Sequence, residues 1–147
     1  MTRDEATQLI LNNKRRKKLK WTDLAEVIGN SKEWTAAALT GQMTLSSEQA
    51  GKVGAMLDLP DEAVEILQVV PYKGSFPTAV PSDPLIYRFY ELVNVYGAGI
   101  KELIHEEFGD GIMSAIDFSL NINRETDPKG DRVNIVMSGK FLPYKEY

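Results

Sequence analysis

Apolar and polar residues in the first half of the chain follow the spacing of short amphipathic helices. Apolar residues recur there every three or four positions, and no stretch alternates in the way a strand does. Ser31 can cap one helix, and Ser46 with Gln49 three residues later forms the pattern of a capping box. Thr22 is expected to cap a helix over 23–28. The pattern predicts a bundle of five short helices over about 70 residues, a size that can fold alone.

The second half begins with the pattern of one long helix. Residues 72–82 contain glycine and two prolines and predict a linker. Asp83 followed by Pro84 is a typical helix start, with a capping side chain and proline at the first helical position. Apolar residues then recur at spacings of three and four as far as Leu103. We expect this helix to end before the Gly-Asp-Gly sequence at 109–111.

The period of the sequence changes after this helix. Residues 112–122 alternate between apolar and polar, so they predict a strand with one apolar face. A loop is expected at 124–131, and residues 133–137 predict a second strand that forms a hairpin with the first. The sequence Ser-Gly-Lys at 138–140 is expected to form a turn.

These elements predict an α+β chain with two domains, a helical domain at 1–75 and a helix with a β-hairpin at 76–147. A single helix and a two-stranded hairpin are too thin to bury the large apolar residues of both strands. The helical domain already closes on its own core, so we expect another subunit to cover the hairpin. The sequence therefore predicts an obligate oligomer.

Composition restricts the chemistry of this oligomer. The chain has 147 residues, of which 43% are hydrophobic and 26% charged, with no Cys and one His. These counts exclude a disulfide scaffold, a thiol nucleophile, a Cys-ligated metal site and a His-rich metal centre. No apolar run approaches the roughly 20 residues that cross a bilayer, and the polar start does not resemble a secretory signal. We expect a soluble cytoplasmic protein.

A basic run at residues 14–20 and the helix-turn-helix spacing of residues 22–39 raise the alternative of a DNA-binding regulator. However, residues 1–75 hold ten Lys and Arg against ten Asp and Glu, whereas a DNA-binding domain is basic. The helix that would read the bases is rich in alanine, which suits packing better than base recognition. We therefore expect no nucleic-acid partner and interpret the basic run as a solvated helix face.

The candidate chemistry begins with Arg88 and Glu91, which are spaced to project from one face of the long helix. Tyr87 and Tyr90 flank them. A guanidinium held by a carboxylate suits an anion site, because it offers a planar fork that is always charged. The alternative is a surface ion pair, which is common on helices and contributes less than about 1 kcal/mol.

Ser114 is the second candidate, because it follows the Gly-Asp-Gly turn and its hydroxyl can help to hold an oxyanion beside the turn amides. The alternative is a strand residue that faces a polar neighbour. No Gly-x-Ser-x-Gly motif surrounds it, so a Ser-His-Asp triad is not supported. The single histidine, His105, is interpreted as a helix-end residue that the helix dipole favours as a cation.

Residues from 83 onward also carry an ordered series of motifs. They are Asp83-Pro84, Tyr87-Arg88-Phe89-Tyr90-Glu91, Val95-Tyr96-Gly97, His105-Glu106, Phe108-Gly109-Asp110-Gly111-Ile112, Ser114-Ala115-Ile116 with Phe118, Gly139-Lys140 and Leu142-Pro143. This series resembles cyanase, the family also called cyanate hydratase or cyanate lyase. The helical half is similar to the repressor-like domain of that family at residues 37–42 and 57–59.

The resemblance implies a reaction of cyanate with bicarbonate as co-substrate, giving carbamate and carbon dioxide. Carbamate then decomposes to ammonia and a second carbon dioxide. The catalytic Arg, Glu and Ser of the family fall on Arg88, Glu91 and Ser114. The resemblance also implies no metal or organic cofactor, and a homodecamer of five dimers with intertwined C-terminal segments and active sites at subunit interfaces. A purely structural oligomerisation domain, in which Arg88 and Glu91 form an interface ion pair, is the alternative.

Overall fold

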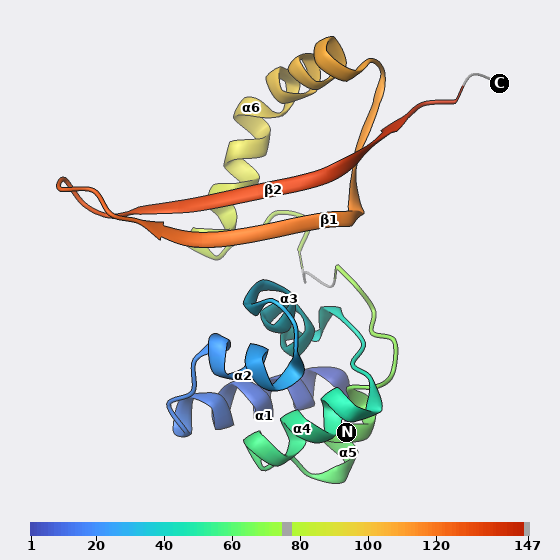
Figure 1. Cartoon of the computed structure of the whole chain (residues 1–147), viewed down its shortest axis with the longest axis vertical. Helices are drawn as coiled ribbons and strands as arrows, with labels where there is room; N and C mark the ends of the chain where they lie inside the picture. Colours follow the sequence, from blue (N-terminus) through green and yellow to red (C-terminus); the bar gives the residue numbers. More distant parts are fainter. Residues whose placement is uncertain (75–77, 146–147) are drawn as a thin grey trace. The chain divides into compact units, whose positions relative to one another are not determined.

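The computed structural model describes residues 1–74 and 78–145 (Figure 1). The chain divides into two compact units, Met1–Ser75 and Phe76–Tyr147. The elements are the helices α1 (Arg3–Arg16), α2 (Trp21–Ile28), α3 (Lys32–Ala37), α4 (Ser47–Leu57), α5 (Asp61–Ile66) and α6 (Pro84–Phe108), the short π-helical segment η1 (Ala38–Gln42), and the strands β1 (Gly111–Glu125) and β2 (Arg132–Pro143). Six α-helices followed by an antiparallel hairpin confirm the predicted α+β class.

Local capping sets most of the helix starts in the first unit. The Ser31 hydroxyl accepts the Trp34 amide at 3.1 Å, and Ser46 and Gln49 form the predicted reciprocal capping box. The prediction for Thr22 is wrong, because α2 begins at Trp21 with Lys20 as its capping residue. The Asp23 carboxylate accepts the Lys20 amide at 2.7 Å, so this acidic side chain starts the helix earlier than the threonine does.

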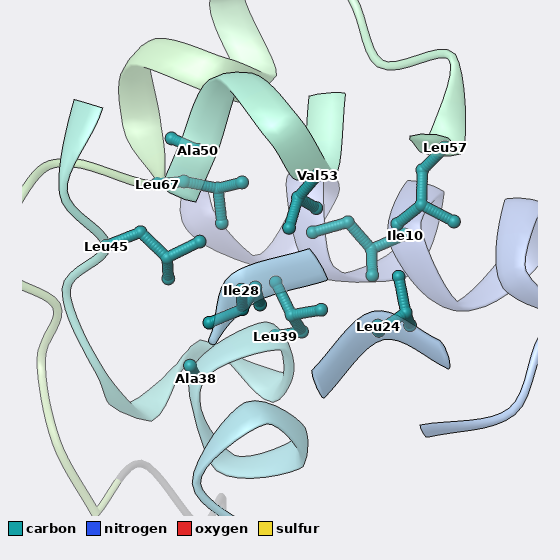
Figure 2. Close-up of a cluster of buried hydrophobic side chains, with 10 residues drawn as sticks. All are labelled: Ile10, Leu24, Ile28, Ala38, Leu39, Leu45, Ala50, Val53, Leu57 and Leu67. Atoms are coloured by element: carbon teal, nitrogen blue, oxygen red, sulfur yellow. The ribbon is translucent and has the colours of Figure 1, made fainter. Parts of the chain in front are cut away.

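The first unit has a continuous apolar core of buried side chains (Figure 2), against which Trp34 of α3 and Val64 of α5 also pack. The cluster consists of Ile10, Leu24, Ile28, Ala38, Leu39, Leu45, Ala50, Val53, Leu57 and Leu67. A fully buried Leu, Ile or Val side chain contributes about 1.5–3 kcal/mol relative to its exposed state. This unit therefore closes on itself, as the sequence predicts.

Two polar side chains at the edge of this core, Asn13 and Arg3, donate to backbone carbonyls. The buried Asn13 side chain donates to the Leu57 carbonyl at 2.8 Å. The Arg3 guanidinium donates to the carbonyls of Ile66 at 2.6 Å and Met43 at 2.5 Å. Burial lowers the pKa of the Arg3 guanidinium. These contacts fix the start of α1 against the ends of η1 and α5.

The basic run is not simply a solvated helix face, and this prediction needs correction. Lys17 donates to the Met56 carbonyl at 2.7 Å and forms an ion pair of 2.7 Å with Asp58, its side chain being 29% exposed. Lys14 lies over the Trp21 ring, with Nζ 4.7 Å from the ring centroid. Arg15, Arg16, Lys18 and Lys20 are exposed as predicted, so the correction concerns Lys14 and Lys17 alone.

The long helix of the second unit begins where the sequence predicts. The Asp83 carboxylate accepts the amides of Leu85 and Ile86 at 2.9 Å each, and Pro84 is the first residue of α6. Gly109, with φ of +90°, ends the helix. None of the residues of α6 is buried.

The hairpin differs from its prediction at two places. β2 is continuous through residues 138–140, so the expected turn there is wrong. β1 departs from regular pairing opposite that segment. Met113 pairs with Phe141 and Phe118 pairs with Gly139, which leaves the four residues 114–117 of β1 opposite a single residue of β2. The sequence suggests a turn in β2, but the structure has a bulge in β1 opposite that segment.

Most apolar side chains of this unit are exposed within the single chain. Ile116 is 98% exposed, Val133 76% and Leu103 68%, and the only buried residues of the hairpin are Gly111 and Ser114. Exposed apolar surface of this extent is typical of an interaction site. Among residues 1–74 and 78–145, no helix is long and apolar enough to cross a membrane.

Candidate active site

Arg88 and Glu91 form the predicted pair on the first turns of α6. The Arg88 Nη1 lies 2.7 Å from the Glu91 Oε2, and the two side chains are 74% and 46% exposed. Tyr87 and Tyr90, which precede Arg88 and Glu91 in the sequence, lie with their ring centroids 5.9 Å apart. An exposed pair of this kind contributes only about 0.2–1 kcal/mol, so stability gives little reason for its presence.

The pair leaves Arg88 able to bind another group. A guanidinium has five N–H donors in a fixed plane, and the bond to Glu91 uses Nη1. The remaining donors can bind a carboxylate-like anion in a bidentate manner. Glu91 holds the guanidinium on the helix face while these donors stay accessible to solvent.

Ser114 is buried in the bulge of β1, and its hydroxyl is held by the backbone. The Oγ accepts the amide of Ile116 at 3.1 Å and the amide of Asp117 at 2.9 Å. A serine oxygen has two acceptor positions, so both are occupied and the hydroxyl hydrogen is left to donate. The groups that contact the Ser114 hydroxyl are therefore amides of the bulge. The sequence suggested either the amides of the Gly-Asp-Gly turn or a polar neighbour.

His105 connects the end of α6 to the start of β1. Its Nε2 lies 3.1 Å from the Gly111 carbonyl oxygen, and its Nδ1 lies 3.4 Å from the Asp110 carboxylate. The Tyr144 ring contacts it edge-on, with centroids 6.4 Å apart. These contacts occupy both ring nitrogens, which agrees with the interpretation of His105 as a helix-end residue and not a base for Ser114.

Within the single chain, two of the three candidate site residues contact each other. Arg88 contacts Glu91, whereas the Ser114 hydroxyl binds the two bulge amides. A cavity of about 350 Å³ within the second unit is lined by α6, β1 and Tyr144, and none of the three candidates lines it. In the described part of the chain, no three His, Cys, Asp or Glu residues are grouped as a metal site.

Sequence reasoning missed the amides that hold Ser114 and the role of the glycine opposite them. A Cβ at Gly139 would overlap the backbone carbonyl oxygen of Ser114, so the two strands approach closely there. The available signal was an isolated glycine between alternating residues, which is typical of a bulge or a close backbone approach.

Comparison with known proteins covers both units. A family model described as the N-terminal part of cyanate hydratase matches residues 3–71, and one described as the cyanate lyase C-terminal domain matches residues 78–146. Proteins named cyanate hydratase from Thiobacillus denitrificans and Dechloromonas aromatica are 76% and 69% identical to the chain over 147 residues, the full length of both sequences in each pair.

A solved structure agrees with these matches. The crystal structure of cyanase from T. urticae is 36% identical to this chain, with a TM-score of 0.80, and the alignment covers 94% of this chain and 96% of that one. Two family models that together span nearly the whole length, full-length relatives and a similar fold all agree. The chain is thus an enzyme that belongs to the cyanate hydratase, or cyanate lyase, family.

Proposed function

We propose that the chain decomposes cyanate in a reaction that depends on bicarbonate. A bicarbonate oxygen attacks the cyanate carbon, and the resulting dianion takes up a proton and loses carbon dioxide to leave carbamate. Carbamate takes up a second proton and decomposes to ammonia and another carbon dioxide. Membership of the family supports cyanate as the substrate. The observation that carries the proposal is the Arg88 guanidinium, held by Glu91 with other donors accessible.

Electrostatics assigns the substrate-binding role to Arg88. Both substrates are anions, and the chain has a net charge of −4, so its overall field does not attract them. The attraction must therefore be local. Arg88 binds bicarbonate or the dianionic intermediate through its remaining donors, and Glu91 fixes the plane of the guanidinium.

Ser114 contributes a hydrogen bond to the same anion. Because the bulge amides occupy both acceptor positions of its oxygen, the hydroxyl is oriented as a donor. It is not the nucleophile, since bicarbonate supplies the attacking oxygen. Holding two anions in contact replaces an unfavourable encounter in solution by a local reaction, an effect of proximity. This chemistry requires neither a metal nor an organic cofactor.

We further propose that the site is completed between subunits. Within one chain, Ser114 makes no hydrogen bond to Arg88 or Glu91, and α6 buries none of its residues. Covering these apolar surfaces with other copies would place Ser114 near the Arg88 of a neighbour and exclude water, which strengthens the charge interactions. An assembly of five dimers with intertwined C-terminal segments, as in the decamer implied by the resemblance, meets this requirement.

The first test is ammonia release from the purified protein given cyanate, with and without added bicarbonate. We expect ammonia release to start at once with added bicarbonate and only after a lag in carbon dioxide-free buffer, because carbon dioxide from the first turnovers hydrates to bicarbonate. A folded oligomer that releases no ammonia under either condition would contradict the proposal and favour the structural oligomerisation domain.

Substitution of Arg88 tests the assignment of the site. Arg88→Leu is expected to reduce turnover about 100- to 1000-fold, as for the loss of a donor to transition-state charge, while sedimentation shows the oligomer still assembled. The matched control is Arg124→Leu, because Arg124 forms a similar exposed ion pair with Asp131 at 3.0 Å in the same unit. Near-normal turnover in Arg88→Leu would overturn the assignment.

A further inference from the structure

Gly139 lies inside β2, at the edge of the bulge that contains Ser114. It pairs with Phe118 of β1, and the irregular segment 114–117 lies directly before Phe118. Its φ angle is outside the left-handed region, since the positive-φ glycines of the described chain do not include it. A need for unusual backbone geometry therefore does not explain the glycine.

Space explains it instead. A Cβ built on Gly139 would overlap the backbone carbonyl oxygen of Ser114, and it would lie 2.5 Å from the Met113 Cγ and 3.2 Å from its Sδ. The Met113 side chain can turn away from such a contact. The Ser114 carbonyl cannot move without moving the residue that carries it, so a side chain at position 139 must displace Ser114 or separate the strands.

Displacement of Ser114 would disturb the bonds that orient its hydroxyl. The Oγ accepts the amides of Ile116 and Asp117, and both amides lie in the same bulge as the carbonyl that contacts Gly139. The direction of the Ser114 hydroxyl thus depends on the conformation of the bulge. That conformation depends in turn on the absence of a side chain at Gly139 on the opposite strand.

We propose that Gly139 is a positioning residue for cyanate decomposition, acting through Ser114. The absence of a side chain lets the Ser114 carbonyl lie against β2, and this close approach holds the bulge in the shape that aims the hydroxyl as a donor. The inference rests on the proposed role of Ser114. A displacement of roughly 1 Å in a positioned group lowers activity by about 100-fold.

The test is a double-mutant cycle made of Gly139→Ala, Ser114→Ala and the double variant, each measured as the bicarbonate-dependent release of ammonia. We expect Gly139→Ala to lower kcat/KM by about 100-fold in the natural chain, as for a comparable misplacement. In the Ser114→Ala background, the same change should lower it by less than about threefold, because the group being positioned is already gone. An equal loss in both backgrounds would overturn the inference.

Gly111→Ala is the matched control for crowding of the hairpin. A Cβ there would overlap the Leu142 carbonyl oxygen and lie 2.6 Å from the Phe141 ring, so it disturbs the same two strands by a similar overlap. We expect this variant to lose thermal stability but to keep kcat/KM within about fivefold, since it does not touch the Ser114 carbonyl. A 100-fold loss in Gly111→Ala would show that general crowding is sufficient and would overturn the inference.

A second variant keeps the inference testable if Gly139→Ala does not fold. Met113→Ala combined with Gly139→Ala removes the two side-chain contacts and leaves the contact with the Ser114 carbonyl as the main overlap. With Met113→Ala as its reference, the same 100-fold loss is expected. Failure of both Gly139 variants to fold, when Gly111→Ala folds, would assign Gly139 to hairpin stability and overturn the inference.

The same measurements separate this inference from the proposed function. An inactive natural chain would overturn the proposed function and the inference with it. Full activity in Ser114→Ala would overturn the role of Ser114 and the inference, while the proposed decomposition of cyanate would stand. An active natural chain with a large loss in Ser114→Ala and none in Gly139→Ala would overturn the inference alone.

Discussion

The first unit completely buries leucines such as Leu24, Leu39 and Leu57, whereas the second leaves Leu85 and Leu103 of α6 69% and 68% exposed. Leu24 and Leu57 lie in the regular helices α2 and α4, as Leu85 and Leu103 lie in α6, and Leu39 lies in the short η1 segment. The difference lies in what each helix finds to pack against within one chain. Short helices in the first unit surround a shared core (Figure 2), while α6 has only a thin hairpin as its companion.

This difference separates two sources of stability. Burial of apolar surface stabilises the first unit within the chain. The second unit relies on helix capping and strand pairing, which form its elements but do not cover them. Its stability should therefore depend on the proposed oligomer and on protein concentration, in the manner of a dimer whose folded monomer is marginal.

The largest expected effect comes from removing a core leucine. Leu57→Ala should lower the free energy of unfolding of the first unit by about 2–5 kcal/mol, because it removes a fully buried side chain and leaves a cavity. Both tryptophans of the chain, Trp21 and Trp34, lie in this unit, so their fluorescence during urea unfolding reports on it alone.

Leu103→Ala is the matched substitution in the second unit. It should leave the tryptophan transition unchanged and instead raise the protein concentration at which the oligomer dissociates, measured by sedimentation velocity. If Leu103→Ala lowered the tryptophan midpoint as much as Leu57→Ala does, the two units would unfold together and the comparison between them would fail.

A smaller effect is expected at the helix caps, which the two units share. Ser46→Ala removes half of the capping box of α4 and should destabilise the first unit by about 1 kcal/mol. Ser47→Ala, at the exposed neighbouring position, is the control and should have almost no effect. Asp83→Ala removes the corresponding cap of α6 and should leave the tryptophan transition unchanged. Equal effects of Ser46→Ala and Ser47→Ala would contradict the role of the cap.

Caps and spacings are also what made much of this fold predictable from sequence. Asp83, Pro84 and Gly109 mark the two ends of α6 because each acts on its immediate neighbours. The spacing of Arg88 and Glu91 is equally local, so it predicts their contact correctly. Thr22 is not the cap because the Asp23 side chain already accepts the amide of Lys20, two residues earlier.

The bulge could not be predicted in the same way. Its position depends on which residues of β1 and β2 are paired, and that register is set across the hairpin instead of along the chain. The local sequence therefore predicts a turn at Gly139, although this residue lies inside β2. The amides that orient Ser114 were hidden for the same reason, since Ile116 and Asp117 reach its oxygen only in the bulged conformation.

The smallest effect we predict is a dependence on pH at the edge of the first unit. The hydrogen bond from Lys17 lowers the pKa of the Asp58 carboxyl, with a further contribution from the charges of Lys17 and Arg16. A carboxyl with a lowered pKa in the folded state adds stability above its unfolded pKa of about 3.9, and this stability is lost as the pH falls through the lower folded value.

Asp58→Asn suits the test because Asp58 has a left-handed backbone conformation that asparagine also tolerates. The stability difference between the natural chain and Asp58→Asn, measured by tryptophan fluorescence, should be constant above about pH 5 and disappear below the folded pKa. Lys17→Met should abolish most of this pH dependence, and a difference that persists unchanged into strong acid would contradict the ion pair as its cause.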